Sequence, residues 1–163
     1  MRLRDAASWE DERVTLLARL VTFVDIDEGD DASEASGLSF SARHDAVLTD
    51  GRRVLLLNDR GWSQSTWIFS SGGPPMQENQ SAPWEFVTRE QVEDSARSVV
   101  GPDEPYGDYT RAEMAAGHWA TLAATLGREG VEVDATEVSG LPHDVELSDR
   151  VIARLADRPT KSA

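Results

Sequence analysis

The chain has 163 residues and no cysteine, and its 30 acidic residues outnumber 16 Lys and Arg residues to give a formal net charge of −14. This charge repels nucleic-acid phosphates and anionic lipid headgroups, so direct binding to a nucleic acid or a membrane is not expected. The absence of cysteine excludes disulfides, thiolate nucleophiles and thiolate metal sites, and it suits a reducing, cytoplasmic compartment.

The length and the change of pattern along the chain predict a single α+β domain over residues 1–163. Residues 1–87 are expected to be mainly β and residues 88–158 mainly helical, with residues 159–163 as a tail. The start of the chain becomes acidic before any apolar run long enough for a signal peptide, and no later apolar run is long enough to span a membrane. We therefore expect a cytoplasmic protein.

Residues 13–27 are ambiguous between a strand and a helix. Val21 to Ile26 has the β-branched and aromatic content of a strand, whereas the polar residues of the segment recur at helical spacing. We expect a strand, antiparallel to the strand that follows it.

An acidic patch at residues 25–31 invites comparison with a calcium-binding loop. Counted from Asp25, the sixth position, where an EF-hand loop requires Gly, is Asp30. Starting the count at Asp27 instead places Gly29 at the third position. The acidic, Gly- and Ser-rich residues 28–37 are therefore expected to form a solvated loop without a metal.

Residues 38–48 carry a clear strand pattern, because apolar and polar residues alternate with a period of two. His44 falls on the apolar side of this strand, where a packed histidine is more common than a ligand. The apolar run over residues 52–57 predicts a second strand.

The dipeptide Asp50-Gly51 lies between these two runs, and Asp-Gly in that place predicts a β-hairpin with a two-residue type I′ turn. In the register of such a turn, Val47 faces Val54 and His44 faces Leu57. This hairpin is the central prediction for the first half of the chain.

Residues 59–86 are the segment that packing explains least. Three of the five tryptophans lie in it: Trp62, Trp67 and Trp84. Residues 67–69 and 84–86 are expected to form short strands joined by a loop over residues 70–83. The tryptophans either hold this long loop on the core or anchor a ligand or partner, since Trp is a preferred interface residue.

The second half of the chain carries four helix starts. Three are capping boxes, at Thr88-Arg-Glu-Gln91, Thr110-Arg-Ala-Glu113 and Asp134-Ala-Thr-Glu137, and the fourth is Ser148 before an apolar run. Apolar residues recur at helical spacing after each start. We expect three or four helices that cover one face of a short antiparallel sheet.

Sequence motifs for catalysis are weak. No segment matches a phosphate-binding glycine loop, an HExxH zinc motif or a GxSxG nucleophile motif. His118 lies at the margin of an apolar helix face and has no carboxylate at a local spacing that would make it a general base. His143 precedes Asp144 in an expected surface loop. No catalytic residue, cofactor or metal is predicted, and an enzyme is less expected than a binding protein.

Two classes of function follow. The first is non-catalytic binding of a specific, basic protein partner, as an immunity protein, antitoxin, chaperone or regulator does, although acidity can also serve solubility alone. The second is a small-molecule site or modest enzyme between sheet and helices. The candidate binding residues are Trp62, Trp67, Trp84, His118 and His143. A structural role in an assembly, which an exposed apolar stripe at Ile152 and Leu155 would indicate, is a third possibility.

Overall fold

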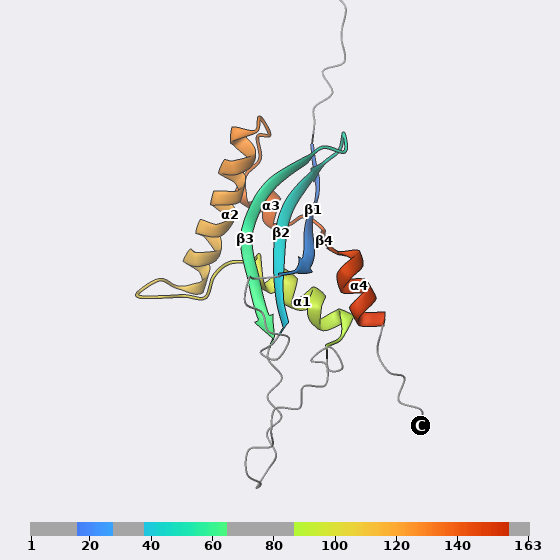
Figure 1. The fold of residues 1–163 in the computed structure, drawn as a ribbon. Coiled ribbons are helices and arrows are strands. Elements are labelled where there is room, and N and C mark those ends of the chain that lie inside the picture. Colours follow the sequence, from blue (N-terminus) through green and yellow to red (C-terminus); the bar gives the residue numbers. More distant parts are fainter. Residues whose placement is uncertain (1–15, 28–37, 65–86, 157–163) are drawn as a thin grey trace, which may run out of the picture.

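The computed structural model describes residues 16–27, 38–64 and 87–156. Four strands form one sheet in the order β3-β2-β1-β4. The strands are β1 (Leu17–Ile26), β2 (Leu38–Leu48), β3 (Arg53–Gln64) and β4 (His143–Leu147). The first three are antiparallel neighbours, and β4 lies parallel to β1, as Figure 1 shows. The expected α+β fold is confirmed, and the segment 13–27 contains the expected strand, antiparallel to β2, over Leu17–Ile26.

Four helices follow the expected start signals: α1 (Arg89–Val99), α2 (Arg111–Arg128), α3 (Ala135–Ser139) and α4 (Asp149–Ala156). All three predicted capping boxes form, with the side chains of Thr88, Thr110 and Asp134 accepting hydrogen bonds from backbone N–H groups of the first turn. Ser148 caps α4, because its hydroxyl accepts a hydrogen bond from the N–H of Val151 at 3.2 Å. The helix starts were therefore predicted correctly.

The β2–β3 hairpin forms, but the predicted register near its turn is wrong by one residue. Val47 pairs with Arg53 rather than with Val54, and the Leu48 N–H donates to the Arg52 carbonyl at 2.9 Å. Gly51 has φ of +87°, so a single left-handed residue closes a three-residue loop in place of the expected two-residue turn. Irregular pairing on both sides of His44 shifts the register again, and His44 pairs with Leu57 as predicted.

The expectation that His143 and Asp144 lie in a surface loop is also wrong. Both belong to β4, whose first residue pairs with Leu20 of β1. Within β4 the side chains of His143, Val145 and Leu147 point toward the helices, whereas Asp144 and Glu146 take part in ion pairs on the opposite face. This alternation is the period of a strand, and in five residues between a Pro and a helix cap it is easily taken for a loop.

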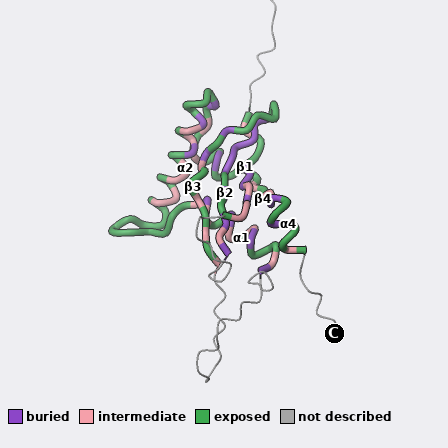
Figure 2. The backbone as a smooth tube through the Cα atoms, in the orientation of Figure 1, coloured by how far each residue is buried: buried purple, intermediate pink, exposed green. Residues whose placement is uncertain are grey.

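The core consists of two apolar clusters on the helix-covered face of the sheet. One packs α2 and α3 on the end of the sheet near the β2–β3 turn, and its central residues are Leu20, Leu48, Val54, Leu122, Leu126 and Val138. The other packs α1 and α4 on the opposite end, around Val24, Phe40, Val92, Leu147 and Val151. Figure 2 shows the buried segments facing one another along the sheet and the helices.

Several expectations fall on residues that the structure does not describe: the loop over residues 28–37, the strands at 67–69 and 84–86, the loop joining them, and the tail at 159–163. Within the three described ranges, no helix is both long and apolar enough to cross a bilayer.

Candidate functional site

A group of polar side chains lies between the two apolar clusters, which we call the histidine seam: Thr22, His44 and His143. The Thr22 hydroxyl is within hydrogen-bond distance of His44 Nδ1, at 2.9 Å, and of His143 Nε2, at 2.7 Å. The two imidazole rings meet edge to face with centroids 4.9 Å apart. Thr22 and His44 are buried and His143 is half-buried. Three neighbouring strands thus contribute one side chain each to a hydrogen-bonded interior chain.

The seam histidines are neutral at pH 7. Burial, together with charge on His143 and on His118, lowers the pKa of His44 to about 3. Burial also lowers the pKa of His143, and the guanidinium of Arg97 on α1 acts in the same direction, against the opposing effect of Asp144. Because both rings are neutral, the single hydroxyl proton of Thr22 can go to one imidazole while the oxygen accepts N–H from the other. The network is thereby satisfied without a net charge in the core.

His118 on α2 lies near this seam, with its ring edge-on to Trp119 at 4.8 Å. Burial lowers its pKa, the nearby Arg60 lowers it further, and Asp103 opposes the change. Arg60 and Asp103 form an ion pair at 2.6 Å that joins β3 to the segment before α2. No hydrogen-bond partner of the buried Nε2 of His118 is found in the described part of the chain.

Trp62 on β3 stacks on Phe40, with ring centroids 4.8 Å apart and an interplanar angle of 18°. Its indole N–H is buried, and the described residues provide it with no acceptor. The side chain therefore packs on the cluster beneath α1, as a tryptophan that holds a segment on the core does.

The seam has the residue types of a nucleophile and its base but not the access that catalysis requires. A hydroxyl next to an imidazole is the arrangement of activated Ser and Thr nucleophiles. Here Thr22 is 0 % exposed and His44 is 1 % exposed, so a substrate does not reach either group. Among the residues that the structure describes, no three His, Cys, Asp or Glu side chains are placed to hold a metal ion. Two of the three seam residues are thus enclosed in the interior, and His143 is half-buried.

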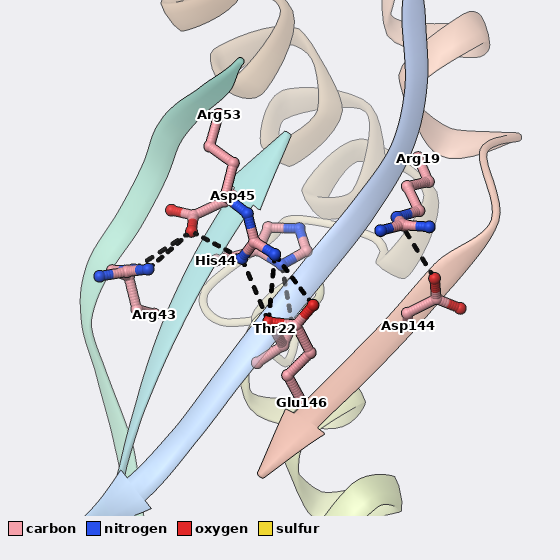
Figure 3. A network of polar contacts seen from close by, with 8 residues as sticks. All are labelled: Arg19, Thr22, Arg43, His44, Asp45, Arg53, Asp144 and Glu146. Carbon is pink, nitrogen blue, oxygen red and sulfur yellow. Dashed lines mark hydrogen bonds and ion pairs between the residues drawn. The ribbon is translucent and has the colours of Figure 1, made fainter. Parts of the chain in front are cut away.

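The opposite face of the sheet carries a network of ion pairs, shown in Figure 3. Asp45, nearly buried, lies 3.1 Å from Arg43 and 3.8 Å from Arg53, and Arg53 reaches Glu146 on β4 at 2.9 Å. A further pair joins Arg19 to Asp144 at 3.5 Å. Charges of opposite sign are therefore balanced on this face.

The negative charge collects elsewhere, on what we call the acidic arm: residues 101–140, from the end of α1 to the end of α3. The arm has eight acidic and two basic residues, whereas the other described residues have eleven and nine. The eight are Asp103, Glu104, Asp108, Glu113, Glu129, Glu132, Asp134 and Glu137, and all are exposed. Figure 2 shows exposed residues along the segment between α1 and α2 and on the outer side of α2.

Six of these eight carboxylates make no ion pair with another described residue, since only Asp103 and Glu104 do so. In the sequence, residues 1–87 and residues 88–163 have the same acidic excess, since each part has 15 acidic and 8 basic residues. In the structure, most of the net charge of the described residues lies on this one arm. The acidic arm is therefore the strongest electrostatic feature of the described surface.

The structure describes three of the five predicted binding residues: Trp62, His118 and His143. His143 joins His44, which the sequence pattern indicated as a packed residue, through Thr22, and His118 lies near this seam on α2. Trp62 packs on Phe40 in the cluster beneath α1, and Trp67 and Trp84 fall outside the described residues. The sequence reasoning missed Thr22. Its signal was a polar residue at an inward position of a strand, between the apolar residues Leu20 and Val24.

Comparison with known proteins does not add a function. The chain matches no protein-family model, no curated protein and no solved structure.

Proposed function

We propose that the protein acts by non-catalytic binding of a basic protein partner and that the acidic arm is the contact surface. The observation that carries this proposal is the concentration of eight exposed carboxylates against two arginines on residues 101–140. Complementary charge speeds encounter and selects among partners more than it adds affinity. A partner with a positively charged surface is thus the one that the arm favours.

The scaffold supports the same role. Leu122 and Leu126 of α2 are buried against the sheet, so the outer side of the helix is held in a fixed position. The carboxylates lie on the loops and helix ends around this anchored helix. Binding residues on loops that a rigid core positions are a common arrangement in recognition proteins.

The buried state of the histidine seam supports a binding role over an enzymatic one. The hydroxyl and the imidazoles that resemble catalytic groups hydrogen-bond to one another inside the protein. A folded acidic protein with such an interior suits the role of an immunity protein, antitoxin, chaperone or regulator that binds a basic protein.

The test is affinity capture at low salt with three proteins. The arm variant Asp108→Asn/Glu129→Gln/Glu132→Gln removes three exposed carboxylates that make no ion pair with a described residue and take no part in a capping box. The control variant Asp27→Asn/Asp59→Asn/Glu90→Gln removes three exposed carboxylates outside the arm, so both variants change the net charge equally.

We expect the wild type and the control to retain the same basic protein in a stoichiometric amount, and the arm variant to retain much less. Because the attraction is screened by salt, retention should fall steeply between about 50 and 300 mM NaCl. Capture of no stoichiometric partner, retention that salt does not change, or equal retention by the arm and control variants would contradict the proposal.

A further inference from the structure

The acidic arm contains a pair of exposed aromatic rings, in what we call the tyrosine turn (residues 106–109). Tyr106 is 66 % and Tyr109 is 56 % exposed, and their ring centroids are 5.5 Å apart. Two large rings side by side in water form an exposed apolar patch, whereas the other large exposed apolar residues of the described chain are Leu16, Leu55 and Ile152. Such a patch rimmed by charged residues is typical of an interaction surface.

The turn has a defined conformation. The Tyr109 N–H donates to the Tyr106 carbonyl at 3.2 Å, and Gly107 adopts φ of +59°, the left-handed conformation that closes the turn. Directly after it, Thr110 begins α2 through its capping box with Glu113. The backbone that carries the two rings is thus ordered before any partner arrives, which reduces the entropy lost on binding.

Two ion pairs hold the segment on either side of the turn. Asp103 pairs with Arg60 of β3 at 2.6 Å, and Glu104 pairs with Arg111 of α2 at 3.1 Å. The carboxylate of Asp108, inside the turn, makes no ion pair with another described residue. Asp108 lies between the two tyrosines in the sequence, so a cation at the turn is attracted both by the aromatic quadrupole and by charge.

Among cations, the guanidinium group fits this arrangement better than an ammonium group. It is planar and stacks on an aromatic face, and it is more weakly hydrated, so it loses less on contact with a ring. It also offers several N–H donors to a neighbouring carboxylate at the same time.

We propose that the tyrosine turn holds arginine side chains of the partner, so that an arginine-rich segment docks on Tyr106, Tyr109 and Asp108. This inference rests on the proposed function and adds to it the contact residues and the side-chain chemistry of the partner. The remaining carboxylates of the arm supply attraction over a longer range.

The experiment uses the full chain and two fluorescein-labelled probes, an octa-arginine and an octa-lysine peptide, with fluorescence anisotropy at about 50 mM NaCl. The ring-deletion variant is Tyr106→Ser/Tyr109→Ser, and Tyr106→Phe/Tyr109→Phe keeps the rings without their hydroxyls. The control Leu55→Ser/Ile152→Ser removes two exposed apolar side chains elsewhere. Circular dichroism establishes that each variant is folded. If ring deletion perturbs α2, the binding of octa-arginine and octa-lysine by the wild type, the Phe variant and the control still tests the proposal.

We expect wild type, the Phe variant and the control to bind octa-arginine more tightly than octa-lysine, and ring deletion to weaken octa-arginine binding about five- to thirtyfold, the range for two lost cation–π contacts. Equal binding of the two peptides by wild type, or unchanged binding after ring deletion, would overturn the role of the turn. If the arm variant Asp108→Asn/Glu129→Gln/Glu132→Gln still loses binding in that case, the proposed function stands. Failure of wild type to bind either peptide would count against both.

Discussion

The replacement of Thr22 by Val tests whether the histidine seam stabilises the fold through its hydrogen bonds. Val has the shape of Thr but no hydroxyl, so the change leaves His44 Nδ1 and His143 Nε2 without the partner they have at 2.9 and 2.7 Å. Loss of the partner of a buried polar group costs about 1–3 kcal/mol. His44 is fully buried, whereas the half-buried His143 can turn to water.

The lost hydrogen bond should carry its full cost at His44 and part of it at His143. We therefore expect Thr22→Val to lower the free energy of unfolding by about 2–4 kcal/mol. For a chain of this size each kcal/mol changes the melting temperature by about 2–4 °C, so the expected decrease is about 5–15 °C. Thr22→Ser is the matched control, because it keeps the hydroxyl and loses one buried methyl group, at a cost of about 1 kcal/mol.

The assay is urea unfolding at pH 7.5, followed by far-UV circular dichroism, with equal m-values as the sign that the unfolding transition is the same. If hydrophobic burial alone set the stability, the Val variant would be the most stable, the wild type with Thr22 second and the Ser variant the least stable. If the hydrogen bonds of the seam stabilise the fold as argued, the wild type is the most stable, the Ser variant second and the Val variant the least stable. A Val variant as stable as the wild type, or more stable than the Ser variant, would refute the reasoning.

Three further predictions concern other parts of the fold. The pKa of His44 is about 3 in the folded protein and about 6.5 in the unfolded chain, so this residue alone should lower the free energy of unfolding by about 2 kcal/mol from pH 7.5 to 5. His44→Gln should remove this part of the pH dependence in urea titrations. Ser148→Ala removes the cap of α4 and should cost about 1–2 kcal/mol by thermal melting. A Cβ on Gly61 would lie 2.6 Å from the Phe40 carbonyl oxygen, so Gly61→Ala should destabilise the protein. Gly117 of α2 has open space around it, so Gly117→Ala should stabilise the protein by about 0.5–1 kcal/mol in the same melts.

The helical half of the fold could be predicted from the sequence because its signals are local. A capping box places donor and acceptor within four residues, and the structure shows the reciprocal bonds at Thr88, Thr110 and Asp134. The residue at which each of these helices begins therefore follows from the local sequence. For the same reason the alternation of β2 predicted a strand correctly.

The pairing of strands was less predictable because it depends on distant partners. Asp50-Gly51 is compatible with a two-residue turn and with a three-residue loop, and the choice between them moves the register by one residue. β4 has only five residues, and it is a strand because β1 offers a free edge for parallel pairing. Such a strand has little local pattern of its own.

The candidate site follows the same rule. Thr22, His44 and His143 are separated by up to 121 residues, and each is ordinary in its own segment. Their chemistry appears only when β1 lies between β2 and β4. The tyrosine turn, by contrast, lies within four consecutive residues, but its exposure depends on how α2 packs, since Tyr109 at a helix start is also a position for packing against the first turn.

If the acidic arm binds a partner as proposed, the length of α2 limits how that partner can contact it. The eight carboxylates form two groups of four, one before and in the first turn of α2 and the other after its last turn. An α-helix rises about 1.5 Å per residue, so the 18 residues of α2 separate these groups by about 27 Å. An extended segment of eight residues spans about the same length, but it loses much entropy if it must stay straight. For the proposed function, we therefore expect a partner that contacts both groups to be a folded protein with two basic patches, and a short peptide to engage one group at a time. Since the exposed tyrosine pair of the arm lies in the first group, we expect a short arginine-rich segment to bind first at that end of α2.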